Sequence, residues 1–276
     1  MTQVLAPQTV LRTTDDRLPT VFLAVCHSEW TKLRTVRSTM WALVFTVIST
    51  IGLGVLLTAL VVGHWDQRSP SVISGFDPLL YSYAGLNLAQ LSIGVLGVLV
   101  MTSEYATGVI RLTFGATPQR RLLLGAKVLT FSAVVAAVSL ISCVTVFFIC
   151  QALLTAKHAG VSITDPGVAR AVLGGAVHMV LIGVIAVGVG AIVRHTAGAV
   201  AILFAVLLII PGIVQLLPAP WKNDITLYLP NSAGSAMSAV VRFPNLLAPT
   251  AGFLVLLAYA AATIGAAMLL LQRRDA

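Results

Sequence analysis

The sequence predicts an all-α integral membrane protein with six transmembrane helices, because its composition is strongly apolar and its few charges are unevenly placed. Of its 276 residues, 58% are apolar and only 9% are Asp, Glu, Lys or Arg, whereas a soluble domain is about 25% charged. Each charge-free stretch is longer than the ~20 residues that a helix needs to cross a bilayer core of about 30 Å. The six stretches without those four residue types are 38–63, 78–103, 128–156, 171–193, 196–221 and 243–272.

These runs are continuously apolar, whereas strands of a transmembrane β-barrel alternate in polarity over about ten residues. Helices are therefore the predicted way to satisfy the backbone in lipid. We expect a disordered cytoplasmic tail over 1–19, an amphipathic helix over 20–39 and a single transmembrane domain over 40–276. The expected spans are about 41–62, 79–101, 128–154, 171–193, 197–217 and 246–271, with a cytoplasmic loop at 102–127 and an outer loop at 218–245.

The distribution of basic residues predicts the orientation. With six spans, both termini lie on one side of the membrane. Twelve of the 17 Lys and Arg residues fall on that side and five on the other. The positive-inside rule then places both termini in the cytoplasm of a multi-pass protein of the cell membrane. Most of the net charge of +8 is explained by topology, with attraction to anionic lipid as a second use.

The segment 20–39 has the pattern of an amphipathic helix. Apolar residues including Trp30 recur at helical spacing, and Glu29, Lys32, Arg34 and Arg37 are expected on the other face. Such a helix can lie in the plane of the membrane interface. The alternative is that it extends the first span into the cytoplasm.

The outer loop 218–245 contains several prolines, between which 231–241 reads as a short helix that is too small to span. It either dips into the outer leaflet or belongs to a plain extracellular loop. Within the fifth span, Pro211 and Gly212 predict a kink or local unwinding.

Motifs for chemistry are absent from the sequence. It has no P-loop for ATP phosphates, no metal-ligand spacing and no nucleophile elbow. Cys143 and Cys150, seven residues apart, indicate packing more than a bridge. Transport driven by ions needs ionisable groups inside the spans, and His178 is the one candidate, with ordinary packing as its alternative. Energy for transport must therefore come from a partner.

The loop 102–127 is the most extensive cytoplasmic surface within the bundle. It opens at Glu104, and Gly108 can relax its backbone before a short apolar stretch. Thr117 and Pro118 make a good helix start. A short apolar and basic helix held between two spans can insert into a groove of a cytoplasmic protein. It can equally be an interfacial loop anchored to lipid phosphates.

Three stretches carry a resemblance to a known family: 28–38 (SEWTKLRTVRS), 104–127 and 229–234 (LPNSAG). With the six-span layout, which matches over essentially the whole chain, they resemble a permease subunit of the type-2 ATP-binding-cassette (ABC) transporters, in the actinobacterial style. The resemblance implies that 20–39 is the connecting helix, that 104–127 holds the coupling helix for a separate ATPase, and that 218–245 contains short outer-leaflet helices. It also implies that two permease subunits, identical or paralogous, pair around a path.

The resemblance assigns roles to individual residues. The ATPase-coupling set is Glu104, Gly108, Ile110, Arg111, Pro118, Arg120 and Arg121, and the connecting-helix set is Trp30, Lys32, Arg34 and Arg37. Candidates for the translocation path are Asn87, Gln90 and Pro211. For Asn87 and Gln90 the competing interpretation is hydrogen bonding between helices. No catalytic, cofactor-binding or metal-binding residue is expected in this chain, since ATP and Mg would be bound by the partner.

The function expected from the sequence is therefore the permease of an ABC exporter for a hydrophobic or amphipathic substrate, such as a drug, antibiotic, peptide or lipid. Two copies of a cytosolic ATP-binding subunit would drive it, and the chain itself would not be an enzyme. The alternative is a membrane anchor or sensor that does not transport and recruits a cytosolic regulator. An intramembrane enzyme is the third possibility, and no constellation of residues supports it.

Overall fold

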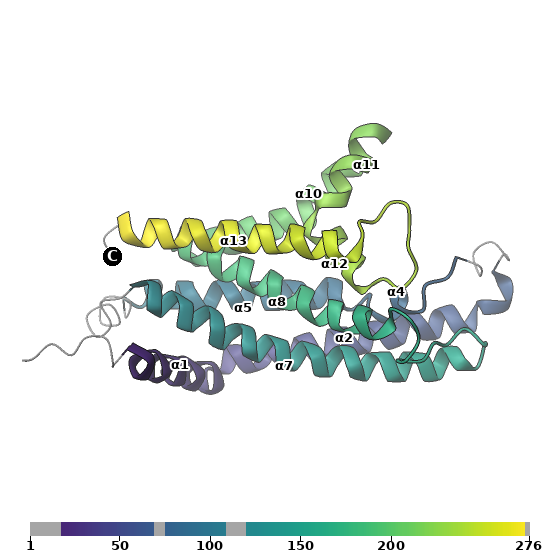
Figure 1. The fold of residues 1–276 in the computed structure, drawn as a ribbon, viewed down its shortest axis with the longest axis horizontal. Helices are drawn as coiled ribbons and strands as arrows, with labels where there is room; N and C mark the ends of the chain where they lie inside the picture. The colour runs from purple at the N-terminus through teal and green to yellow at the C-terminus, as the bar shows by residue number, and fades with distance from the viewer. Residues whose placement is uncertain (1–17, 69–74, 109–119, 274–276) are drawn as a thin grey trace, which may run out of the picture.

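The computed structural model describes residues 18–68, 75–108 and 120–273, and within them the chain is helical with no strand. Six helical segments are long and apolar enough to cross a membrane, which confirms the six predicted spans and the multi-pass architecture at that level. They run along a common direction as an elongated bundle (Figure 1). These segments are α2 (Arg37–Gly63), α5 (Leu86–Ala106), α7 (Arg120–Thr155), α8 (Val168–Val193), the combined segment Thr196–Val214 and α13 (Pro249–Arg273).

The amphipathic helix before the first span is α1 (Leu18–Thr35), which ends four residues earlier than the sequence predicts. Val36 has an extended backbone (φ −78°, ψ 119°), and α2 begins directly after it. This extended residue interrupts the helix, so the chain can change direction between α1 and α2. A β-branched residue such as valine tolerates the extended conformation well. α1 packs beside the first part of α7, at the same end of the molecule as the C-terminus (Figure 1).

The second span does not begin as one helix at residue 79. After α2 and the short turn η1 (Trp65–Gln67), the chain forms α4 (Pro78–Ser82), turns, and enters α5. Gly85 is required in this turn, because a Cβ there would collide with the backbone of Ser49 and Thr50. The side chain of Asp77 caps α4, as an Asp before a helix commonly does.

Helices extend from both sides into the segment 102–127, which the sequence predicts as a cytoplasmic loop. α5 continues to Ala106 and α7 already begins at Arg120. With 36 residues, α7 is about 54 Å long and exceeds a bilayer core of about 30 Å. Glu104 and Lys127 consequently lie on helices, where each finds oppositely charged partners.

α8 forms the centre of the bundle and packs against α5, α7, α12 and α13. Small residues allow its close approach to α5, as expected for helices in lipid. A Cβ on Gly97 of α5 would lie 2.8 Å from the carbonyl oxygen of Gly183 and 3.0 Å from the Cβ of Ala186.

The fifth span departs from regular α-helix where the sequence predicts it. α9 (Thr196–Phe204) is followed by the π-helical segment η2 (Ala205–Ile209) and by α10 (Ile210–Val214). Pro211 lies directly after the π-helical turn, and such turns are a recognised cause of kinks. This span ends at Val214, three residues before the predicted bound.

Two short helices separate the fifth and sixth spans. α11 (Ala219–Tyr228) projects away from the bundle, whereas α12 (Pro230–Ser238) packs against α8 and α13 (Figure 1). Since Ala233, Gly234 and Met237 of α12 are buried, this segment is part of the packed bundle and the interpretation as a plain loop was wrong.

Candidate functional site

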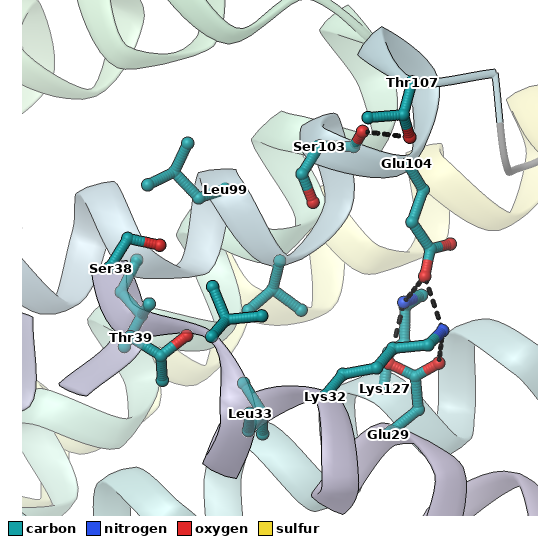
Figure 2. A pocket seen from close by; sticks show the side chains of 13 residues that line it. Glu29, Lys32, Leu33, Ser38, Thr39, Leu99, Ser103, Glu104, Thr107 and Lys127 are labelled. Atoms are coloured by element: carbon teal, nitrogen blue, oxygen red, sulfur yellow. Dashed lines mark hydrogen bonds and ion pairs between the residues drawn. The ribbon is translucent and has the colours of Figure 1, made fainter.

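Four charged side chains meet where α1, α5 and α7 come together, and we call them the charge quartet (Figure 2). Glu29 and Lys32 come from α1, Glu104 from α5 and Lys127 from α7. The Nζ atom of Lys127 lies 2.8 Å from Oε2 of Glu29 and 2.6 Å from Oε1 of Glu104. The Nζ atom of Lys32 lies 2.7 Å from Oε1 of both glutamates.

The charge quartet is largely withdrawn from water. The side chain of Lys127 is 1% exposed, and those of Glu29 and Glu104 are 4% and 9% exposed. Removing such groups from water costs several kcal/mol per ion unless opposite charges and hydrogen bonds compensate. Two carboxylates and two ammonium groups give a formal charge of zero, so opposite charges compensate one another within the cluster, while Oε2 of Glu104 is buried without a hydrogen-bond partner among the described residues.

Lys32 is the quartet's contact with solvent, since 41% of its side chain is exposed. Partial burial by itself lowers the pKa of Lys32. Hydrogen bonds to Glu104 and Glu29, together with their negative charge, outweigh that effect, and the pKa is raised above the ordinary lysine value. Lys32 therefore remains protonated throughout the physiological range.

The arrangement on α1 follows from helical spacing. Residues three positions apart share a face of a helix, so Glu29 and Lys32 can both turn toward the bundle, with the buried Leu33 beside them. The sequence placed Glu29 on the outward face, and this expectation was wrong. Of the other connecting-helix residues, Trp30 is 47% exposed, and Arg34 and Arg37 are also exposed.

A cavity of about 280 Å³ adjoins the charge quartet. Its walls come from the break between α1 and α2, including Val36 and Thr39, and from the end of α5, including Leu99 and Ser103 (Figure 2). The quartet forms the remaining wall. α1 is thus held to the bundle by ionic contacts and by the buried Leu33, beside an open space.

The predicted coupling residues are placed as follows. Glu104 belongs to the charge quartet, Gly108 follows the end of α5 with a positive φ of 70°, and Arg121 is exposed in the first turn of α7. Arg120 is the first residue of α7, and its side chain is not among those that the structure describes. Ile110, Arg111 and Pro118 lie outside the described residues. The structure therefore brings together Glu104 with Lys127, Glu29 and Lys32, a combination that sequence reasoning missed.

The predicted path residues have different environments. Gln90 is 1% exposed, and its Nε2 donates a hydrogen bond to Oδ1 of Asn231 in α12 at 3.2 Å. This contact favours the interpretation of Gln90 as a link between helices. Asn87 is exposed and donates to the carbonyl of Ala84, while Pro211 is half-buried in α10.

His178 is 3% exposed in the middle of α8, with its ring packed against Gly234 of α12. This contact fits ring packing, while Nε2 of His178 is buried without a hydrogen-bond partner among the described residues. Cys143 and Cys150 are both buried and unbridged. Among the described residues, no group of three or more His, Cys, Asp or Glu side chains could hold a metal ion. The charge quartet with its cavity is therefore the leading candidate for a functional site.

Comparison with known proteins adds no family assignment: no protein-family model matches this sequence, and no curated protein matches it significantly.

Proposed function

We propose that this chain is the membrane-spanning permease subunit of an ABC exporter. It resides in the cell membrane with both termini in the cytoplasm, and two permease chains pair around a path. Two copies of a separate cytosolic subunit bind ATP and Mg and hydrolyse the ATP. Their movement is transmitted to the permease, which carries a hydrophobic or amphipathic substrate outward. The chain itself is not the ATPase.

The charge quartet is the observation that carries this proposal. It fastens α1 to both helices that flank the segment 107–119, since Glu104 is near the end of α5 and Lys127 is near the start of α7. Separating buried opposite charges costs several kcal/mol, so a displacement of either flanking helix moves α1 with it. This is the linkage that a permease needs if a motor protein presses on that segment.

Two further features support the proposal. The layout of six spans with α11 and α12 between the fifth and sixth agrees with the family that the sequence resembles. Away from the charge quartet and Asp77, which lie near the ends of the helices, the described interior of the bundle offers His178 and hydrogen-bonded amides such as Gln90, and an ion-driven cycle ordinarily needs ionisable groups there. A separate source of energy fits this interior better.

The proposal is tested by co-purification with a candidate motor. The tagged chain is expressed together with the protein encoded by the neighbouring reading frame, which we expect to be a P-loop ATPase, extracted in mild detergent, and weighed by native mass spectrometry. We expect a complex that contains two permease chains and two ATPase chains. Deleting 109–111 should abolish the complex while the permease still elutes as a folded species.

Undiminished capture of the ATPase by the deletion variant would contradict the assignment. If the neighbouring reading frame encodes a kinase or a regulator and the chain binds it instead, the anchor or sensor alternative is favoured. These outcomes are distinguishable by the mass of the complex alone.

A further inference from the structure

Two adjoining hollows lie at the opposite end of the bundle from α1 and the C-terminus, where α8 and α13 both begin. The first has a volume of about 240 Å³ and the second about 310 Å³. Arg170 of α8 and Pro249 of α13 line both of them. The two hollows therefore adjoin, with Arg170 and Pro249 between them, and we treat them as one candidate site.

The first hollow is an apolar groove between two transmembrane helices. Leu173 and Val177 of α8 line one side, Phe253 of α13 the other, and Met237 of α12 closes it. Leu173 is 54% exposed and Phe253 is 38% exposed. These residues belong to two helices that are long and apolar enough to cross a bilayer core, so acyl chains are the expected surroundings of the groove.

The second hollow is more polar and more basic. It is lined by the segment that connects α12 to α13, including Arg242, together with Arg170. The guanidinium of Arg170 donates to the carbonyl of Met237 at 3.1 Å and to that of Ala239 at 2.7 Å. These bonds satisfy carbonyl groups at the C-terminus of α12 and hold the arginine in place with two of its five N–H donors.

Among the described residues, no carboxylate lines either hollow. Two carboxylates lie outside the lining: Asp165 is five residues before Arg170, and the oxygens of Asp77 accept hydrogen bonds from the backbone N–H groups of Leu79, Leu80, Val240 and Val241. The positive ends of the α8 and α13 helix dipoles also face this region. The local charge of the site is therefore positive, and its polar part is complementary to an anion.

We propose that this site binds an anionic phospholipid. One acyl chain occupies the groove between α8 and α13, and the phosphate lies in the basic hollow against Arg170 and Arg242. An arginine at the end of a span beside an apolar groove matches the geometry of such a lipid, in which a negative headgroup sits directly above hydrocarbon. This inference is independent of the proposed transport function, since it uses neither the charge quartet nor a partner.

The experiment measures lipid binding to the full chain in a neutral detergent, by native mass spectrometry with added phosphatidylglycerol or phosphatidylcholine. We expect phosphatidylglycerol to bind more tightly. Arg242→Gln should weaken phosphatidylglycerol about fivefold, the effect of one basic residue near a membrane surface, and should weaken phosphatidylcholine less, because its choline ammonium already offsets the charge of its phosphate. Val177→Trp, which fills the groove, should weaken both lipids.

Lys222→Gln is the matched control. Like Arg242, Lys222 lies in the connection between the fifth and sixth spans, but it belongs to α11 and lines neither hollow. It should leave phosphatidylglycerol affinity unchanged. Glycerol phosphate, which lacks acyl chains, should not displace the lipid at equal concentration. The α-helical circular dichroism signal identifies variants that fail to fold.

The proposal is overturned if folded Arg242→Gln binds phosphatidylglycerol as the unaltered chain does. It is also overturned if Lys222→Gln weakens binding equally, which would indicate general surface charge. Full displacement by glycerol phosphate would mean that the site recognises a free phosphate and not a lipid.

Discussion

Replacing Lys127 by Met tests whether the charge quartet holds α1 to the bundle. Methionine keeps an unbranched chain of similar volume and removes only the charge. Because Lys127 is 1% exposed and lies 2.6 and 2.8 Å from two carboxylates, its loss leaves Glu29 and Glu104 with Lys32 alone. The buried cluster then carries an uncompensated negative charge.

Removing one partner from a buried ion pair destabilises a protein by about 3–5 kcal/mol. At about 2–4 °C per kcal/mol for a protein of this size, Lys127→Met should lower the Tm by about 6–20 °C. Thermal unfolding in detergent, followed by intrinsic fluorescence at one fixed heating rate, measures this change. Limited proteolysis should also show earlier cleavage within α1.

The control is Lys157→Met. Lys157 pairs with Asp66 at 2.7 Å, a distance like those in the charge quartet, but the side chains are 30% and 81% exposed. An exposed pair contributes about 0.2–1 kcal/mol, so the Tm should fall by at most about 4 °C. If Lys127→Met lowers the Tm no more than Lys157→Met does, the charge quartet does not fasten α1 to the bundle.

A double variant separates charge from packing. In Glu29→Gln with Lys127→Met, the remaining pair is Lys32 with Glu104 at 2.7 Å, and the cluster is neutral again. Its Tm should therefore exceed that of Lys127→Met alone, with a coupling of about 0.5–3 kcal/mol. A Tm below that of the single variant would refute the electrostatic reasoning.

Three other predictions concern separate parts of the fold. Asp77→Asn should lower the Tm by several degrees, because its carboxylate accepts backbone N–H bonds from both α4 and the segment after α12; an unchanged Tm would contradict this role. Gly234→Ala should lower the Tm, because the added methyl group would collide with the ring of His178. Adding His178→Ala should restore much of the lost Tm, and no recovery would contradict the packing interpretation. The pKa of Lys32 is raised above the usual 10.5, so its stabilising effect is fully present below pH 10.5 and is lost as pH rises through the higher folded-state pKa. The difference in Tm between the unaltered chain and Lys32→Gln should accordingly shrink only above that pH, and a difference that shrinks between pH 6 and 9 would refute the assignment.

The six spans could be predicted because each charge-free run is long enough to cross a bilayer, and the irregularity near Pro211 because proline cannot continue a regular helix. The bends at Val36 and Gly85 could not be predicted. They depend on contacts such as that of Gly85 with the backbone of α2, which local sequence does not reveal.

The charge quartet was also hidden from the sequence, for a physical reason. Glu29 and Lys127 are 98 residues apart, and Lys32 and Glu104 are 72 apart. Charged residues at the ends of spans usually reach toward the membrane interface, and the sequence does not show which of them turn toward one another instead. A glutamate three positions before a lysine on α1 was the available signal, and it was outweighed by the apolar pattern on the other face.

The most direct test of the proposed function is the vanadate-sensitive ATPase activity of the chain reconstituted in proteoliposomes with the candidate P-loop ATPase that co-purifies with it. We expect the full chain to raise ATP hydrolysis above that of the ATPase alone. Deleting 109–111 should return the rate to that of the ATPase alone, while the permease remains folded. Equal rates with the full chain, the deletion variant and no permease would contradict the account.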